Sequence, residues 1–402
     1  MSQKEAEDRD GPVGAVQYRM RLVEDIRTIP AAQWDALGGV TLEPCARHAF
    51  LSALQTSGCV GGQSGWLARF VILEDLESGQ IAAAAPLYLK DHSYGEYVFD
   101  WAWADAYHRH GLAYYPKGVV AIPFTPVPGV RLLARHAVTR RALAESLRDL
   151  TGQLGLSSLH LLYPCERDAE VLQEAGFLRR SGVQFHWRNP GWDNFEDYLA
   201  ALTQPKRKKI RAERRKVREA GVTVRMLTGP EIGEQDWRFF YACYENTYAQ
   251  HHSTPYLNLA FFLELGRSMP ESLLLARAER QGEALAAAFF LRTSDTLYGR
   301  YWGALTPLPC LHFETSYYAP IEWALQQGIT RFEGGAQGEH KMARGFQPVP
   351  TCSFHHLSHP AFEQAVARFL ERETGSVEAY LDELNERTPL RARSTLSPET
   401  DD

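Results

Sequence analysis

The sequence repeats one pattern in two stretches, GQIAAAAPLYLKDHSYGEY at residues 79–97 and EALAAAFFLRTSDTLYGRY at residues 283–301. Identical alanine, leucine, aspartate, tyrosine and glycine residues recur between them at a constant offset of 204 positions without a gap. Each stretch follows a β-type apolar run, 68–74 or 273–279, and a turn that contains Gly79 or Gly282. Each copy is therefore predicted to form three antiparallel strands in a meander.

A second shared pattern follows each meander. Residues 142–154 and 315–327 have helical spacing, and each run ends at a glycine, Gly155 or Gly328, as helices commonly do. A strand-like run follows each glycine, and the offset there is 173, so the first copy holds an insertion in its aromatic and proline-rich stretch 101–131. The ungapped identities favour internal duplication over two chance runs.

Composition agrees with a large folded protein. The 402 residues are enough for two or three domains, and 45% hydrophobic residues exclude wholesale disorder. Acidic residues outnumber basic ones by 49 to 43, which gives a net charge of −6. This balance excludes a protein that coats nucleic acid over its whole surface, but it leaves room for a local basic patch.

The sequence also indicates a compartment. The six cysteines include no CxxC pair, which favours reduced thiols over a zinc module or a disulfide scaffold. No stretch approaches the roughly 20 apolar residues that span a bilayer, and the polar start MSQKEAEDRDGP is not a secretory signal. We expect a cytoplasmic protein without a transmembrane segment.

The chain is expected to divide into two similar halves. Further helices are predicted before the second meander, at 195–202, 206–220, 237–249 and 259–269. The natural seam lies near Pro190 and Gly191, which gives an N-terminal half (1–190), a C-terminal half (191–385) and a disordered tail (386–402). The predicted fold class is α/β (α+β), with two tandem units of mixed, mostly antiparallel sheet flanked by helices.

Several motifs carry a family resemblance. They are HWRNPGW (186–192), PKRKKIRAERRKVREAGV (205–222), LYGRYWG (297–303), LHFE (311–314), FEGGAQGEHKMARGF (332–346) and, in the first half, FDWAWADAYHRHGLAYYPK (99–117) and IPFTPVPG (122–129). Together they resemble the predicted N-acyltransferases of the FemAB-like group. The order of elements in each half is also close to that of the GNAT acyltransferase fold.

The resemblance implies a tandem duplicated GNAT-like fold that transfers an acyl or aminoacyl group to an amine acceptor. The more distant FemAB and FemX transferases add amino acids to a peptidoglycan precursor. By this likeness the chain has no tightly bound cofactor, its co-substrate is acyl-CoA or aminoacyl-tRNA, and its acceptor is a cell-wall precursor or a peptide. Lys341 matches a family lysine in a stretch that ends Gly-Phe-Gly, although Gln347 replaces the final glycine.

Catalytic candidates follow from what acyl transfer to an amine requires, namely a proton acceptor and donors for the carbonyl oxyanion. The catalytic candidates are Glu314, His340, Lys341 and His312. Glu314, His340 or a water would accept the proton, and Lys341 would hold the carrier together with a basic helix at 206–218. An imidazole titrates near neutral pH, which suits His340 as a base. The alternatives are that Glu314 only caps a helix and that the segment around His340 is a structural glycine loop.

Substrate-binding candidates lie beside these residues. Arg300 and Trp302 stand two apart on a predicted strand and therefore share a face, and Gly335 and Arg344 belong to the glycine-rich segment. Burial in the core is the alternative for Arg300 and Trp302.

A basic helix is the strongest electrostatic feature. Between positions 206 and 218, nine of thirteen residues are Lys or Arg, and Ile210 and Val217 form only a thin apolar stripe. We assign Lys208, Lys209 and Arg211 to binding of a phosphate-rich carrier, CoA or tRNA; a solvated helix face is the alternative.

The expected pyrophosphate turn of a CoA enzyme is not evident. Arg331–Ala336 matches its pattern literally but follows the helix instead of preceding it, which we interpret as coincidence. Residues 304–311, the correct place, contain prolines and no glycine pair. This weakens acyl-CoA as the donor.

In the first half, an acidic and aromatic strip contains Asp100, Trp103, Asp105 and Tyr107. Such side chains suit an amine-bearing or sugar-bearing acceptor, and aromatic packing explains them equally well. The histidine pairs lack metal-ligand spacing, so no metal is predicted. Non-catalytic recognition of a wall precursor or peptide is the rival function, a scaffold is the third, and the active half and the oligomeric state stay open.

Overall fold

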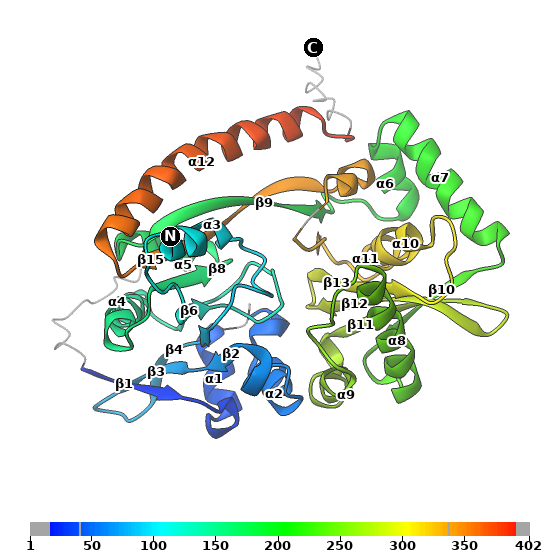
Figure 1. The fold of residues 1–402 in the computed structure, drawn as a ribbon. Helices are drawn as coiled ribbons and strands as arrows, with labels where there is room; N and C mark the ends of the chain where they lie inside the picture. Colours follow the sequence, from blue (N-terminus) through cyan, green and yellow to red (C-terminus); the bar gives the residue numbers. More distant parts are fainter. Residues whose placement is uncertain (1–16, 40–41, 337, 391–402) are drawn as a thin grey trace, which may run out of the picture.

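The computed structural model describes residues 17–39, 42–336 and 338–390 (Figure 1). Most of the predicted tail, 386–402, lies outside these residues. Its described part is docked, because the Thr203 N–H donates to the Pro389 carbonyl at 3.0 Å and Leu390 forms a bridge with Leu202. No helix in the described ranges is long and apolar enough to cross a membrane.

Runs of strands and helices are interspersed along the chain. The strands are β1 (Tyr18–Val23), β2 (Trp66–Ala68), β3 (Phe70–Asp75), β4 (Ile81–Ala85), β5 (Leu87–Lys90), β6 (Lys117–Val120), β7 (Leu133–Ala134), β8 (Ser158–Leu162), β9 (Leu178–Arg188), β10 (Thr223–Thr228), β11 (Leu273–Arg280), β12 (Glu283–Arg292), β13 (Thr296–Ala304), β14 (Arg331–Glu333) and β15 (Gln347–Leu357). The α-helices are α1 (Ala31–Gly38), α2 (His48–Thr56), α3 (Trp101–Arg109), α4 (Ala137–Gln153), α5 (Glu166–Glu174), α6 (Phe195–Ala201), α7 (Gln204–Glu219), α8 (Glu234–Gln250), α9 (Leu259–Ser268), α10 (Leu311–Phe313), α11 (Ala319–Gln326) and α12 (Pro360–Glu386). The helices predicted from the sequence are confirmed within a few residues at each end.

Two sheets are present in the described residues. One has four strands in the order β1-β3-β4-β7, and the other has eleven in the order β10-β11-β12-β13-β14-β9-β15-β8-β6-β5-β2. Their ladders are antiparallel except for β13–β14 and β6–β8, which are parallel. The long sheet runs through both halves, and α12 lies along β9 and β15 (Figure 1). The predicted mixed, mostly antiparallel α/β class is confirmed.

The strand register supports the duplication. In the first copy Ile72 pairs with Ala84, and in the second Ala276 pairs with Ala288, which is the same pair shifted by 204 positions. Gly155 and Gly328, the predicted helix-ending glycines, have φ angles of 63° and 69°, the left-handed conformation that favours glycine.

The prediction of a third strand in the first copy is wrong. After β5 the chain turns instead, with φ of 80° at Gly95 and 62° at Tyr97. Strand β6, which comes from the insertion, pairs with β5 in its place. This segment keeps Tyr94, Gly95 and Tyr97 of the repeat, but these shared residues are not sufficient to form the strand, and pairing at the sheet edge contributes to the outcome.

The two halves exchange their last strands. β9 pairs with β15 from Leu178 to His186, and its end, His186–Arg188, pairs with β14 of the second half. β15 in turn pairs with β8 of the first half over Ser353–Leu357. The division at residue 190 remains a prediction, and β9 joins the two halves within the eleven-stranded sheet.

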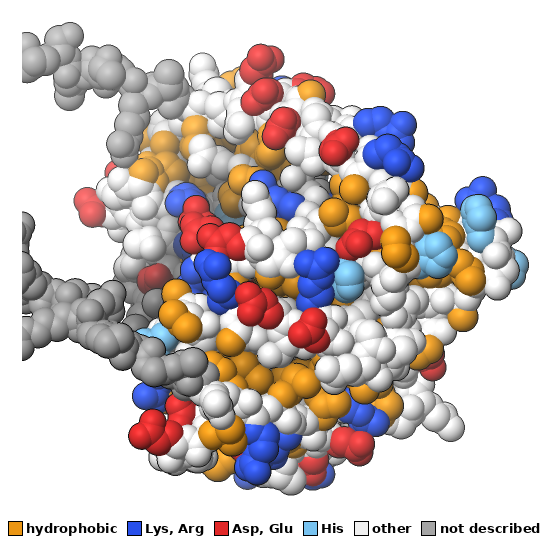
Figure 2. All heavy atoms as spheres, turned by 90° about the vertical axis from the view of Figure 1, so that its left-hand side faces the viewer, with side chains coloured by type: hydrophobic (Ala, Val, Ile, Leu, Met, Phe, Trp, Pro, Cys, Tyr) orange, Lys and Arg blue, Asp and Glu red, His pale blue; other side chains and the backbone are white. Residues whose placement is uncertain are grey.

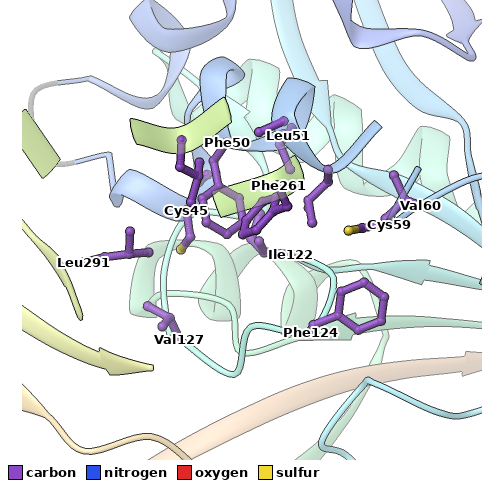
Figure 3. Packing of buried hydrophobic residues seen from close by; sticks show 14 of the residues in the cluster. Cys45, Phe50, Leu51, Cys59, Val60, Ile122, Phe124, Val127, Phe261 and Leu291 are labelled. Carbon is purple, nitrogen blue, oxygen red and sulfur yellow. The ribbon is translucent and has the colours of Figure 1, made fainter. Parts of the chain in front are cut away.

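A shared core also joins the halves. Figure 3 shows Phe50 of α2 beside Phe261 of α9, with ring centroids 5.3 Å apart, and Cys45 and Leu291 pointing into the same packed region. All six cysteines are free thiols.

The strand exchange predicts how fragments behave. A fragment of residues 191–390 lacks β9, so β14 and β15 each lose a neighbour, whereas a fragment of 178–390 keeps the ladder. We expect the longer fragment to unfold cooperatively with temperature and the shorter one to show no cooperative transition by circular dichroism. Indistinguishable melting curves would contradict the exchange as a folding constraint.

Candidate functional site

A cavity opens in the second half where two parallel strands separate. β13 and β14 pair only from Thr296 to Tyr298 and from Arg331 to Glu333. Beyond this point β13 continues to Ala304, while the chain after β14 turns away. The cavity has a volume of about 280 Å³ and is floored by Phe289, Phe290 and Phe332.

Five predicted site residues line this cavity. They come from three separate motifs and are Arg300, Trp302, His312, His340 and Lys341. The fold therefore brings together residues that lie up to 41 positions apart in the sequence.

A β-bulge places Arg300. Phe289 pairs with Tyr301 and Phe290 with Gly299, so Arg300 is the extra residue, and such a bulge redirects a side chain. Its Nη2 donates to the Phe124 carbonyl at 2.6 Å, which ties the cavity wall to the first half.

The opposite wall is helical. Trp302 Nε1 donates to Thr315 Oγ1 at 2.7 Å, and the Trp302 and His312 rings have centroids 4.7 Å apart. Residues Glu314–Tyr318 form a wide π-helical turn, which is often found at functional sites. Ser316 lines the cavity, and its buried hydroxyl has no hydrogen-bond partner among the described residues. A substrate atom would satisfy it.

Lys341 is a buried cation in the cavity wall. Its side chain is 5% exposed, and Nζ lies 3.5 Å from the Gly335 carbonyl oxygen. Burial lowers the pKa of Lys341 to about 8. The ammonium form therefore still prevails at neutral pH and can donate hydrogen bonds to an oxyanion.

Two imidazoles can accept protons. Burial lowers the pKa of His312 to about 4. Partial burial lowers the pKa of His340, and the charges of Lys341 and Arg344 lower it further. His340 Nε2 lies 3.2 Å from the Tyr317 hydroxyl oxygen, so a proton can pass between this pair.

Glycines allow the loop to approach the cavity closely. A Cβ on Gly334 would come within 2.9 Å of Lys341 Cδ and 3.1 Å of Phe346 Cε1. Gly335 has a φ of 81° and lies outside the cavity lining, where its carbonyl faces Lys341. The sequence favours a close turn at Gly334, Gly335 and Gly338, and of these three Gly334 lines the cavity.

Glu314 and Arg344 do not line the cavity. Glu314 is buried and accepts from Arg214 Nη2 at 3.0 Å; burial raises its pKa, and the Arg214 charge opposes that rise. The Arg344 guanidinium lies 3.6 Å over the Phe313 ring and donates to the His340 carbonyl at 2.8 Å. Both side chains support the walls, and Glu314 does so by pairing with Arg214 of another helix instead of capping its own.

The basic helix α7 packs beside this wall. Ile210 and Val217 are buried as predicted, whereas Lys208, Lys209 and Arg211 are exposed. Charges of both signs are interspersed on the side of the molecule that Figure 2 shows, which is the side opposite to α7 in Figure 1.

Glu213, which the sequence analysis did not select, anchors α7. It is buried, accepts a hydrogen bond from the Tyr318 hydroxyl and forms an ion pair with Arg344 at 3.3 Å. The sequence feature that could have identified Glu213 is that it is the one acidic residue in the basic stretch 206–218.

The first-half candidates lie elsewhere. Asp100 is buried, pairs with Lys117 and accepts from the Tyr114 hydroxyl at 2.7 Å. Trp103 and Tyr107 are in the core, and Asp105 is exposed beside Arg109. The structure does not bring these four residues to the cavity. Among the described residues, no cluster of His, Cys, Asp and Glu could hold a metal ion.

Two similar halves with a cavity at a parted strand pair define the class of tandem GNAT-like folds. The FemAB-like family, described as peptidoglycan biosynthesis and recognition, matches residues 25–392. The chain belongs to this family.

Solved structures agree on the fold. FemX is 12% identical, with a TM-score of 0.53, over 84% of this chain and 98% of its own. The C-terminal domain of a putative lysylphosphatidylglycerol synthetase from Agrobacterium fabrum is 10% identical, with a TM-score of 0.50, over 85% of this chain and 95% of its own. L-PGS from Bacillus licheniformis is 11% identical, with a TM-score of 0.50, over 85% of this chain and 97% of its own. A search of curated proteins found no match.

The anchoring of α7 is testable. Glu213→Ala leaves the buried Arg344 without its anion, and we expect a loss of about 3–5 kcal/mol in the free energy of unfolding. Glu219→Ala on the same helix removes an exposed partner of Arg215 and should cost no more than about 0.5 kcal/mol. Urea unfolding compares the two; equal losses would show that the Glu213 contacts do not anchor the helix.

Proposed function

We propose that the protein is an N-acyltransferase that moves an acyl or aminoacyl group from a phosphate-rich carrier to an amine acceptor. The observation that carries this proposal is the convergence of Lys341, His340 and the Ser316 hydroxyl on one cavity in a GNAT-like fold. The family description supports an acceptor related to peptidoglycan, such as a wall precursor or a peptide.

The chemistry assigns a role to each group. His340, with Tyr317 beside it, takes a proton from the acceptor ammonium, either directly or through water. The free amine attacks the acyl carbonyl, and the Lys341 ammonium donates to the developing oxyanion. The bond to the carrier then breaks, the leaving thiolate or alkoxide receives the proton held by His340, and the attacking nitrogen loses its second proton to solvent, which leaves a neutral amide. Glu314 forms an ion pair with Arg214, so His340 is the preferred base of the two.

The carrier is proposed to lie along α7. Arg214 of α7 binds Glu314, so this helix adjoins the cavity wall. Its exposed residues Lys208, Lys209 and Arg211 would contact phosphates. Aminoacyl-tRNA and acyl-CoA remain the two donor candidates, and the missing glycine pair at 304–311 favours tRNA.

Non-catalytic recognition of a wall precursor or peptide is the second candidate. The same absence of the usual pyrophosphate turn favours it, because a degenerate pocket would bind without turnover.

The proposal is tested with acetyl-CoA and a pool of radiolabelled aminoacyl-tRNAs as donors and with amines that include muropeptides as acceptors. We expect radiolabel or acetyl transfer by the wild type and a loss of about 100-fold or more in kcat for Lys341→Met. Arg238→Met, which changes an exposed side chain on α8, is the control and should keep its kcat. Binding of a muropeptide without any transfer would favour the recognition protein.

The pH profile tests the charge of Lys341. Because its folded pKa is lowered to about 8, the ammonium form is lost as the pH rises through 8, and kcat should fall there. Lys341→Arg stays charged in this range, so its residual activity should lack this alkaline limb. A rate that rises through pH 8 in the wild type would instead identify neutral Lys341 as the base.

Charge reversal on α7 separates the two donors. If tRNA is the carrier, changing Lys208, Lys209 and Arg211 to Glu should weaken tRNA binding and reduce the slope of log Kd against log salt by roughly 2 to 3. CoA binding should not change. The matched control reverses exposed Arg109, Arg238 and Arg267 on other helices. Equal effects of both triple variants would argue against a specific carrier site on α7.

A further inference from the structure

A recess lined mainly by the first half, with Tyr256 and Ala336 from the second, lies beside the cavity. It has a volume of about 370 Å³, and the residues lining it include Tyr94, Tyr97, Phe99, Trp101 and Tyr256. Neither the family description nor the proposed transfer chemistry assigns it a role.

Three of the rings around the recess are unusually exposed. Tyr94 and Phe99 are each 58% exposed and Trp101 is 42% exposed, and the Tyr94 and Trp101 rings have centroids 5.0 Å apart at 62°. Aromatic side chains gathered around a hollow, in place of packing in the core, mark a binding surface. These rings therefore need an occupant.

The recess is built from the strand that the first copy does not form. Tyr94, Gly95 and Tyr97 correspond to Tyr298, Gly299 and Tyr301, which lie in β13. With β6 at the sheet edge, the same residue types in the first copy are available for another use.

Specific contacts hold this segment in shape. The Tyr97 carbonyl accepts from the Tyr163 hydroxyl at 2.8 Å, and the Tyr94 carbonyl accepts from Lys90 Nζ at 2.9 Å. Tyr97 has a φ of 62°, a conformation that costs energy in a residue with a side chain. The surrounding contacts offset that cost and fix the recess.

The recess and the cavity are neighbours. The Phe124 ring stacks on Tyr256 with centroids 4.9 Å apart, and the Phe124 carbonyl is bound by Arg300 of the cavity. Ala336 lines the recess and Gly334 lines the cavity, and two residues of chain span at most about 7 Å. The two hollows are therefore close enough for one elongated ligand to reach from one to the other.

The lining specifies an uncharged ligand. Among the described residues it holds no Lys, Arg, Asp or Glu, and its polar groups include the hydroxyls of Tyr94, Tyr97 and Tyr256. A pyranose ring matches this lining, because its apolar face stacks on aromatic rings and its hydroxyls reach phenols. A single ammonium would leave most of the 370 Å³ unfilled.

We propose that this aromatic recess is the acceptor subsite and that it binds an uncharged pyranose sugar ring, leaving the acceptor amine to enter the neighbouring cavity. The assignment to an acceptor rests on the proposed function, whereas binding of the sugar does not.

The test measures sugar binding to the full chain by saturation-transfer NMR, with the β-1,4-linked dimer of N-acetylglucosamine as the probe. We expect a signal with the wild type and a signal at least fivefold weaker with Trp101→Ala and with Phe99→Ala. Phe369→Ala, which removes a 37% exposed ring on α12, is the matched control and should leave the signal unchanged. Trp101→Phe keeps an aromatic ring at this position and should retain part of the saturation-transfer signal.

The remaining outcomes separate the two proposals. Lys341→Met should lose transfer activity but bind the sugar like the wild type. A failure of the proposed chemistry can therefore be distinguished from a failure of sugar binding at the recess. Unaltered melting temperatures of the Trp101 and Phe99 variants exclude misfolding as the cause. No signal with the wild type, equal signals in all variants, or binding of tetramethylammonium in place of the sugar would each overturn the proposal.

Discussion

The antiparallel ladder between β9 and β15 is the constraint on which the rest of the structure depends. Each of these strands ends one half of the chain and then pairs within the sheet of the other half. Backbone hydrogen bonds in a central ladder cannot be left unmade without a cost in free energy, so neither half completes its sheet alone. The exchange fixes the position of β14, whose separation from β13 opens the cavity.

Buried ion pairs then hold the walls of the cavity in the second half in place. Glu213 and Arg214 are neighbours on α7; one binds Arg344 and the other Glu314. A buried ion pair is weak evidence for stability, but removing one partner is strongly destabilising, which makes such pairs effective anchors. Through Arg344 the helix is joined to the backbone of His340, and through Glu314 to the turn that carries Ser316 and Tyr317. The helix proposed to bind the carrier is thereby coupled to the proposed catalytic groups.

The two copies of the duplicated unit have diverged in a complementary way. In the second, β13 and β14 separate around an open cavity. In the first, the corresponding region between β6 and β8 carries a buried polar network in which Lys117 contacts Asp100, and Asp100 accepts from Tyr114. The residues released from the third strand form the aromatic recess beside Arg300 and Phe124. In our proposals one copy therefore supplies the reactive groups and the other a binding surface, and the contact between Arg300 and Phe124 joins them.

The sequence by itself determined the duplication, most helix positions, the mostly antiparallel class and the motifs that supply Arg300, Trp302, His312, His340 and Lys341, because these follow from local periodicity and from residue type. It did not determine the exchange of β9 and β15, the loss of the third strand near Tyr97, or the separation of Glu314 and Asp100 from the cavity. Those features depend on which distant segment wins a sheet edge or supplies a buried counter-charge. Pairing energies of this kind come from contacts between residues far apart in the chain, and only the tertiary structure decides them.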